Sequence, residues 1–339
     1  MAVQSPRIMD CTLREGTYET TFTPADAAHV ARFVHDAGVH HIEVGVDNGV
    51  APRVPYAADA YVAAVLQAVP EASVGVMVVA PSVPVETIER ALQAGASFVR
   101  VAVNATQIRM ALPLLEKAKS LGAGMVTLNA MKTYALPELE VLGAAAEAYR
   151  AGADVFYVVD SAGCMLPDQV SRLVRHLGDV GVASGFHGHD NFSLAVANSL
   201  AALQAGATVI DGTLRGTGRS AGNAQIEVLV KAAQRQGHFT AIDGDLLAET
   251  GEELIAARRL RDRGITYLDL VIGEGRFHTE CLDAAREVAE THGVSLHRLV
   301  REVGRRDPLA PSRELIESVA LDLGRGVTME SATPEETST

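Results

Sequence analysis

The chain contains no tryptophan, and aromatic residues make up only 4% of its 339 residues. Its three cysteines, Cys11, Cys164 and Cys281, are too few and too far apart for a disulfide framework or a cysteine zinc cluster. No apolar run approaches the roughly 20 residues that a membrane span needs. The first residues also lack the charged and then apolar pattern of a signal peptide. We therefore expect a cytoplasmic protein that has no membrane partner.

Positive charge is also scarce, because 29 Lys and Arg residues face 42 Asp and Glu residues, which gives a net charge of −13. Such an acidic chain is a poor partner for nucleic acid, whose phosphates attract basic surfaces. The length is sufficient to bury a large core, in one large domain or in two. The composition therefore indicates a soluble globular protein and disfavours anionic membranes as well as nucleic acid as partners.

Short β-branched runs alternate along the chain with Ala-rich and Leu-rich stretches of helical periodicity. The candidate strands span residues 7–12, 41–46, 74–80, 98–104, 124–129, 155–160, 184–189 and 209–213. Candidate helices lie between them at residues 24–37, 58–68, 85–94, 108–121, 136–151, 167–177 and 194–205. Strands that alternate with helices in this number are typical of a (β/α)8 TIM barrel rather than of a doubly wound open sheet. We predict an α/β fold in which residues 1–232 form the catalytic barrel.

The sequence beyond residue 232 has the pattern of a helical region. Its candidate helices span residues 245–263, 280–291, 296–303 and 313–323. We expect residues 233–328 to form a smaller C-terminal helical domain. Residues 329–339 are polar and rich in Glu, Thr and Ser, which is typical of a disordered tail.

Two histidines, His187 and His189, lie two residues apart at the end of the seventh candidate strand. Side chains alternate along a strand, so both imidazoles point to the same face. Converging imidazoles can bind a metal ion, although they can also be two structural histidines. A metal site requires a third ligand from elsewhere in the chain.

A barrel places its active site at the C-terminal ends of its strands. The first strand is followed there by Arg14 and Glu15, which on their own would read as a surface ion pair. Glu15 is our candidate for the third ligand, since two imidazoles and one carboxylate leave positions open for substrate and water. Such a mixed nitrogen and oxygen site favours Mn²⁺, with Mg²⁺ or Zn²⁺ as alternatives. Arg14 can hold a carboxylate or an oxyanion.

Three other polar residues lie at strand ends. Glu43 and Asp211 can accept hydrogen bonds from histidine or arginine at the barrel mouth. Ser161 either faces the site or caps the helix that follows it. The glycine-rich residues 216–222 read as a phosphate-binding loop or, more simply, as a turn.

Taken together, these segments resemble the pyruvate-carboxyltransferase-like (DRE-TIM) metallolyase superfamily. The resemblance spans nearly the whole chain, and it rests on residues 12–16, 42–44, 160–163, 187–191 and 221–224, which occur in the order of that superfamily. Within it, the chain looks most similar to the 4-hydroxy-2-oxovalerate aldolases, on residues 191–199, 300–306 and 319–323.

The resemblance implies roles for the residues at the barrel mouth. Glu15, His187 and His189 would bind the metal. Arg14 would polarise the 2-oxo group of the substrate and stabilise the enolate. Ser161, together with Arg14 and His187, would contact the substrate. The helical C-terminal part would contact an acylating aldehyde dehydrogenase, in a homo-oligomer or hetero-oligomer.

The chain also departs from the aldolase pattern. The metal carboxylate is Glu15 where the aldolases usually have Asp, and Tyr18 stands where most of them have a catalytic His. The late active-site Tyr of that family is matched most closely by His278, and we interpret this as an exchange of places between Tyr and His. Either Tyr18 or His278 is then the base, and histidine is better suited to that task at neutral pH. Asn223 lies where related enzymes keep an Asn near the metal.

The resemblance implies cleavage of a 4-hydroxy-2-oxo acid to pyruvate and an aldehyde, or the reverse addition. The alternative is an acyl-CoA-dependent Claisen condensation, as in isopropylmalate or homocitrate synthases, which Glu15 and residues 272–278 support. A hydroxymethylglutaryl-CoA lyase is disfavoured, because residues 216–222 contain no cysteine. A scaffold subunit without activity is a third interpretation, against which the complete set of ligands argues.

Overall fold

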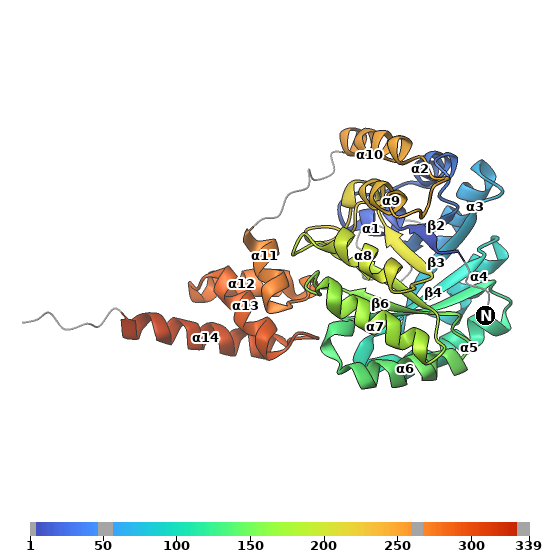
Figure 1. Cartoon of the computed structure of the whole chain (residues 1–339). Helices are drawn as coiled ribbons and strands as arrows, with labels where there is room; N and C mark the ends of the chain where they lie inside the picture. Colours follow the sequence, from blue (N-terminus) through green and yellow to red (C-terminus); the bar gives the residue numbers. More distant parts are fainter. Residues whose placement is uncertain (1–4, 47–56, 259–266, 331–339) are drawn as a thin grey trace, which may run out of the picture. The chain divides into compact units, whose positions relative to one another are not determined.

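The computed structural model describes residues 5–46, 57–258 and 267–330. The chain divides into two compact units, Met1–Gly264 and Ile265–Thr339 (Figure 1). This division differs from the predicted one at residue 232. The reason is that α10 (Gly244–Arg258) packs against α2 and α9 of the barrel and so belongs to the first unit.

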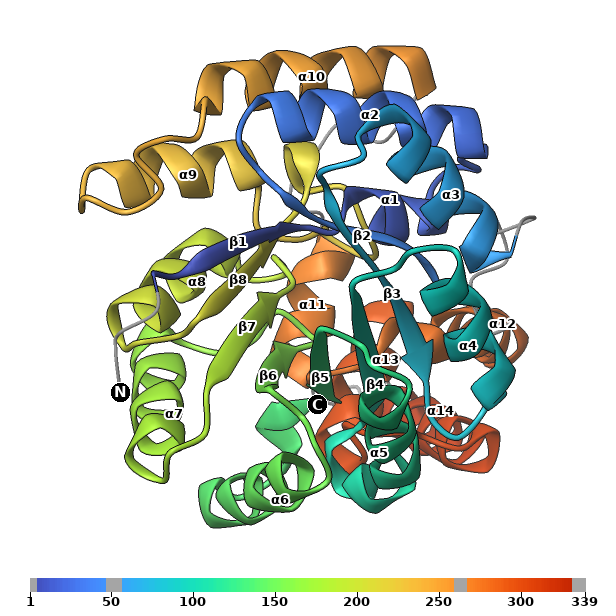
Figure 2. The ribbon, with the colours of Figure 1, turned by 90° about the vertical axis from the view of Figure 1, so that its right-hand side faces the viewer.

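The first unit is a closed barrel of parallel strands in the order β1 to β8, in which β8 pairs with β1 (Figure 2). The strands are β1 (Arg7–Asp10), β2 (His41–Val46), β3 (Ser73–Val79), β4 (Phe98–Asn104), β5 (Met125–Met131), β6 (Val155–Asp160), β7 (Ser184–Gly188) and β8 (Val209–Gly212). The predicted TIM barrel is confirmed, and the predicted strands coincide with these to within about two residues at each end.

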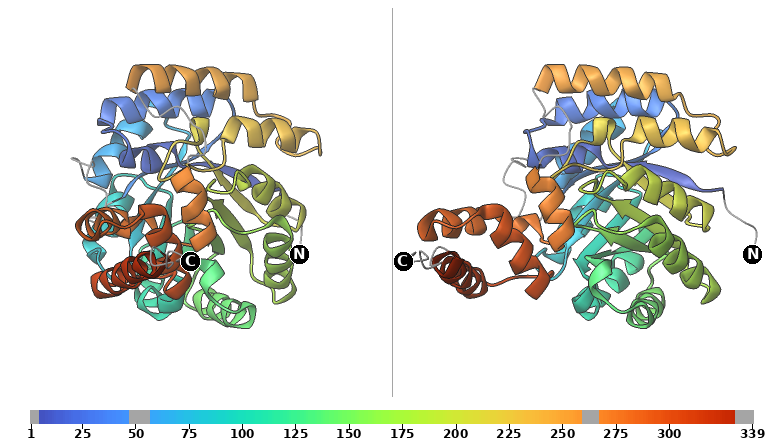
Figure 3. Two further views of the ribbon diagram at one scale, coloured as in Figure 1. Left: turned by 90° about the vertical axis from the view of Figure 1, so that its left-hand side faces the viewer. Right: turned by 60° about the vertical axis from the view of Figure 1, so that its left-hand side comes forward.

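Helices surround the barrel. They are α1 (Thr12–Glu15), α2 (Pro24–Asp36), α3 (Ala58–Ala68), α4 (Val85–Gln93), α5 (Leu112–Ser120), α6 (Glu138–Arg150), α7 (Pro167–Asp179), α8 (Ala195–Gln204), α9 (Ile226–Gln234) and α10, with short 3-10 turns at η1 (Gly16–Tyr18), η2 (Ala105–Met110), η3 (Thr133–Ala135) and η4 (Leu214–Gly216). Figure 3 shows α10 alongside α2 and α9 in both views. No helix in the described part of the chain is both long and apolar enough to cross a membrane.

Successive side chains of each strand point alternately outward and inward, which produces two layers of apolar side chains, one on each face of the barrel sheet. In β4, Val99, Val101 and Val103 point outward and join the large core beneath the helices. Phe98 points inward and joins a separate inner cluster with Met9 and Tyr157. The barrel interior is therefore filled by side chains, and polar residues reach solvent only at its ends.

The second unit is helical, with a hydrophobic core of its own that includes Val271, Phe277, Val288, Val300 and Val319. Its elements are α11 (Tyr267–Gly275), η5 (Thr279–Cys281), α12 (Leu282–His292), α13 (Leu296–Arg306) and α14 (Arg313–Glu330). A helical C-terminal region was predicted, but α11 was not. The predicted tail at residues 329–339 begins inside α14, and residues 331–339 lie outside the described part of the chain.

Candidate active site at the C-terminal end of the barrel

The two histidines lie together where β7 ends. His187 is on β7, and His189 follows it and forms an isolated bridge to Asn223. Their rings meet edge to face, with centroids 5.3 Å apart and an interplanar angle of 79°. Both side chains are almost completely buried. The alternation of a strand therefore brings both imidazoles to one site.

Glu15, at the end of α1 directly after β1, completes the group. One ligand atom each from Glu15, His187 and His189 lies within 4.8 Å of the other two, so the three can hold a metal ion. We call these three residues the metal group. Oε2 of Glu15 is buried and accepts no hydrogen bond from the described residues. A buried carboxylate oxygen without a donor is costly, and a divalent cation would satisfy it, so these residues fit a metal.

Arg14 lies beside the metal group and is 6% exposed. Its Nε donates to Oε2 of Glu43 at 2.9 Å, and its Nη1 forms an ion pair with Glu15. Burial alone would raise the pKa of Glu15, but the positive charge of Arg14 and the neighbouring histidines outweigh it and hold that pKa below its usual range. Glu15 is therefore a carboxylate at neutral pH, as a metal ligand must be.

Asp211, on β8, fixes the tautomer of His187. Its Oδ2 lies 2.9 Å from Nδ1 of His187. Burial alone would raise the pKa of Asp211, but the charge of Arg100 and the hydrogen bond from His187 lower it to about 2. An ionised carboxylate can only accept, so Nδ1 donates and Nε2 keeps its lone pair. This Nε2 lies 3.6 Å from Oε1 of Glu15, on the side of the metal group.

Sequence reasoning missed Arg100, on β4. Its side chain is fully buried inside the barrel and donates to Glu43 and Asp211. Its guanidinium also lies 4.4 Å from the ring centroid of Tyr157. The signal was a single charged residue at an inward-facing position of the strand Phe98–Asn104, whose other residues before Asn104 are apolar.

A second set of potential ligands, Cys11, His187 and Asp211, overlaps the first. The hydrogen bond between Asp211 and His187 already occupies Nδ1 of the histidine. Burial raises the pKa of the Cys11 thiol well above its ordinary value, which disfavours the thiolate that binds metals. Hydrogen bonding inside the barrel therefore explains why these three residues lie close together.

Tyr18 lies at the end of η1, with the guanidinium of Arg219 4.2 Å from its ring centroid. Burial raises its pKa, against the opposing charge of Arg219. The phenol is thus protonated at neutral pH and can donate a proton but cannot accept one.

Ser161 follows β6, and its Oγ accepts a hydrogen bond from the backbone N–H of Lys132 at 3.0 Å. It does not cap the helix after it, because α7 has Leu166 at its N-cap position. Since its oxygen serves as an acceptor, the hydroxyl hydrogen of Ser161 is available to a ligand.

The glycine-rich loop after β8 lies against the metal group. Gly218 has a φ of +146°, and a Cβ there would lie 2.0 Å from Nδ2 of Asn223 and 2.9 Å from Oε2 of Glu15. Nδ2 of Asn223 donates to the carbonyl of Thr217, while its Oδ1 is buried without a hydrogen bond among the described residues. Asn223 and Glu15 therefore both approach Gly218, and no residue other than glycine fits at this position.

His278 belongs to the second unit, where it precedes η5. Its side chain is 5% exposed, and its Nδ1 accepts from the backbone N–H of Glu280 at 3.4 Å. The same atom lies 3.2 Å from a carboxylate oxygen of Glu280. The assignment of His278 as a base stays a prediction.

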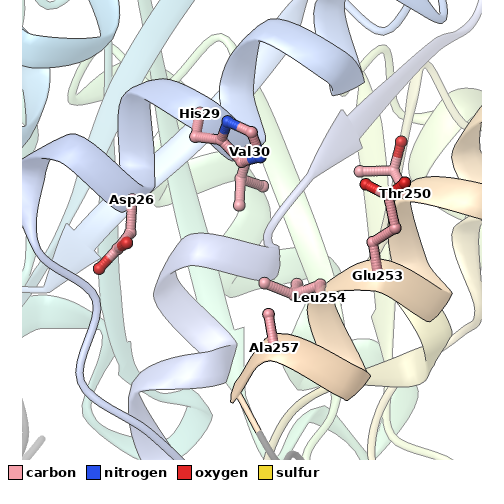
Figure 4. A pocket seen from close by; sticks show the side chains of 7 residues that line it. All are labelled: Asp26, His29, Val30, Thr250, Glu253, Leu254 and Ala257. Atoms are coloured by element: carbon pink, nitrogen blue, oxygen red, sulfur yellow. The ribbon is translucent and has the colours of Figure 1, made fainter.

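A pocket on the outside of the first unit lies between α2 and α10 (Figure 4). It is lined by Asp26, His29, Val30, Thr250, Glu253, Leu254 and Ala257. None of these residues belongs to the site at the barrel mouth, so we do not assign this pocket a part in the chemistry.

Two histidines and a carboxylate at the C-terminal ends of barrel strands are a ligand set typical of metal-dependent enzymes. The fold and the site of this chain therefore place it in that class. The particular family follows from comparison with known proteins. A family model described as HMGL-like matches residues 5–254, and the chain belongs to this family.

Curated relatives, among them the following two, match nearly the full chain. The 4-hydroxy-2-oxovalerate aldolase 4 of Rhodococcus opacus is 36% identical over 326 residues, which cover 93% of each chain. The oxaloacetate decarboxylase of Mycobacterium tuberculosis is 34% identical over 311 residues, covering 89% of this chain and 92% of the relative. Among solved structures, the HMG-CoA lyase of Bacillus subtilis matches 75% of this chain and 94% of its own with a TM-score of 0.65 at 18% identity, which supports the fold alone.

Proposed function

We propose that this protein is a divalent-metal-dependent aldolase that cleaves a 4-hydroxy-2-oxo acid into pyruvate and an aldehyde, or forms it from them. The observation that carries the proposal is the convergence of Arg14 with the metal group in one buried cluster. Full-length relatives named 4-hydroxy-2-oxovalerate aldolase support the same reaction.

Glu15, His187 and His189 would hold the metal, and their mixed oxygen and nitrogen ligands favour Mn²⁺ over Mg²⁺ or Zn²⁺. Asn223 is a further candidate ligand or neighbour, through its Oδ1. When bound, the metal supplies positive charge that polarises the 2-oxo group and stabilises the enolate.

Arg14 donates N–H groups toward the oxygen on which negative charge develops as the C3–C4 bond breaks. Glu43 holds the Nε edge of its guanidinium, so the side chain is oriented before the substrate arrives. The hydroxyl of Ser161 donates to the carboxylate or 2-oxo oxygen of the substrate. These two residues bind and orient the pyruvate half.

The proton of the 4-hydroxyl must pass to a base. His278 is our candidate, because neutral imidazole accepts a proton near pH 7. Tyr18 is protonated at that pH and acts as a hydrogen-bond donor. His278 then acts as the base, and Tyr18 as the hydrogen-bond donor.

A second activity is favoured by the relative named oxaloacetate decarboxylase. Loss of CO₂ from oxaloacetate leaves the same pyruvate enolate that aldol cleavage leaves. Arg14 and the metal group would stabilise it in the same way, and no base at a 4-hydroxyl is needed. We propose decarboxylation as an additional reaction of this site.

An assay with Mn²⁺ on a panel of substrates tests these proposals. We expect pyruvate and aldehyde from 4-hydroxy-2-oxovalerate, and slower CO₂ release from oxaloacetate. Acetyl-CoA with a panel of 2-oxo acids should release no thiol. Thiol release without aldol cleavage would contradict the aldolase and indicate a Claisen synthase. CO₂ release without aldol cleavage would contradict the aldol reaction and leave decarboxylation alone.

A further inference from the structure

Arg100 lies in the middle of β4, where the alternation of the strand points it into the barrel. Its side chain has no exposed surface. An arginine buried to this extent keeps its charge, so the barrel must supply counter-charges and hydrogen-bond acceptors around it.

Two carboxylates on the strands that flank β1 supply them. Nη1 of Arg100 donates to Oε2 of Glu43 on β2 at 2.8 Å, and Nη2 donates to Oδ2 of Asp211 on β8 at 2.6 Å. Tyr157 supports this arrangement, since its hydroxyl donates to the other oxygen of Asp211 at 2.9 Å and its ring faces the guanidinium. A single side chain from β4 therefore links a carboxylate on β2 to a carboxylate on β8.

Each of these oxygens also accepts from a residue of the site. Oε2 of Glu43 accepts from Nε of Arg14, and Oδ2 of Asp211 accepts from Nδ1 of His187. The other oxygen of Glu43 has no hydrogen bond among the described residues, so two arginines alone hold this carboxylate. The carboxylate of Glu43 therefore links Arg100 to Arg14, and the carboxylate of Asp211 links Arg100 to His187.

We propose that Arg100 is a positioning residue that fixes Arg14 through Glu43 and His187 through Asp211. It touches neither substrate nor metal. It sets the orientation of the substrate-polarising arginine and of a metal-binding imidazole together, so both sides of the site depend on one side chain. The roles of Arg14 and His187 rest on the proposed function, but the effect on metal binding can be measured without it.

The test begins with Arg100→Lys, which keeps a positive charge but cannot donate to two separated carboxylates in a fork. We expect the dissociation constant for Mn²⁺, measured by calorimetry on dialysed protein, to rise about 10–100-fold. The kcat for aldol cleavage should fall as well. Tyr157→Phe is the matched control, because Asp211 keeps its bonds to Arg100 and His187, and we expect Mn²⁺ affinity within about threefold of wild type.

A charge-balanced variant covers the case in which Arg100→Lys does not fold. Arg100→Gln combined with Glu43→Gln removes one charge of each sign and leaves Asp211 and the metal group intact. We expect weaker Mn²⁺ binding in this double variant but not in Glu43→Gln alone. If either Arg100 variant is folded and binds Mn²⁺ within threefold of wild type, the positioning role is wrong and Arg100 serves stability alone. Absence of aldol cleavage in wild type would overturn the proposed function and leave this result standing.

Discussion

Tyr18 and His278 are the two residues that we propose for proton transfer. Burial holds the pKa of Tyr18 above its ordinary value of about 10, so this phenol does not titrate in the working range of pH. A histidine base ordinarily titrates near 6.5 and must be deprotonated to act. Tyr18 therefore cannot account for a loss of activity between about pH 7 and pH 5, whereas a histidine base can.

The pH dependence of kcat/KM for aldol cleavage tests the roles proposed for His278 and Tyr18. Wild type should lose activity on the acidic side of neutrality, because the base becomes protonated. Tyr18→Phe should keep this acid limb, whereas His278→Gln should lose it and fall about 10²–10⁴-fold in kcat. An unchanged acid limb and near-normal turnover in His278→Gln would show that another group is the base.

The glycine-rich loop after β8 lies against Glu15. A methyl group at Gly218 would collide with Nδ2 of Asn223 at 2.0 Å, and its φ of +146° is unsuited to other residues. We expect Gly218→Ala to displace Asn223 and Glu15 and to lower both kcat and Mn²⁺ affinity by at least tenfold. The measurement is steady-state turnover together with a Mn²⁺ titration.

Gly143, inside α6, provides the control for this substitution. Nothing lies within 4 Å of a Cβ built there. Alanine is the better helix former, so Gly143→Ala should raise the free energy of unfolding by about 0.5–1 kcal/mol and leave turnover unchanged. Equal turnover in Gly218→Ala and Gly143→Ala would mean that the loop does not shape the site.

The elements of the barrel were predictable because their signals are local. Alternating β-branched runs and helical periodicity gave the strands, and the spacing of His187 and His189 placed both imidazoles on one face. Arg100 was not predictable in the same way. A charge inside an apolar strand conflicts with the local pattern, and only the closed barrel brings Glu43 and Asp211 to it. The role of Ser161 was undecided for a similar reason, because its partner Lys132 lies on a different strand end.

At the scale of the whole chain, the fold class followed from the order of the elements, but the boundary between the units did not. α10 reads in the sequence like the helices after it, and only its packing on α2 and α9 assigns it to the barrel unit. α11 was missed because its glycine-containing sequence has little helical propensity. A dehydrogenase partner and an oligomeric state stay predictions from the resemblance of the C-terminal residues.

Pyruvate formation from 4-hydroxy-2-oxovalerate by dialysed protein, as Mn²⁺ is restored, tests the central claim most directly. Wild type and the surface variant His292→Ala should gain activity along the same saturable curve. His189→Ala should stay folded and inactive, because the metal group loses a ligand. Full activity before Mn²⁺ is added, or a wild-type curve from His189→Ala, would contradict a metal-dependent aldolase built on Glu15, His187 and His189.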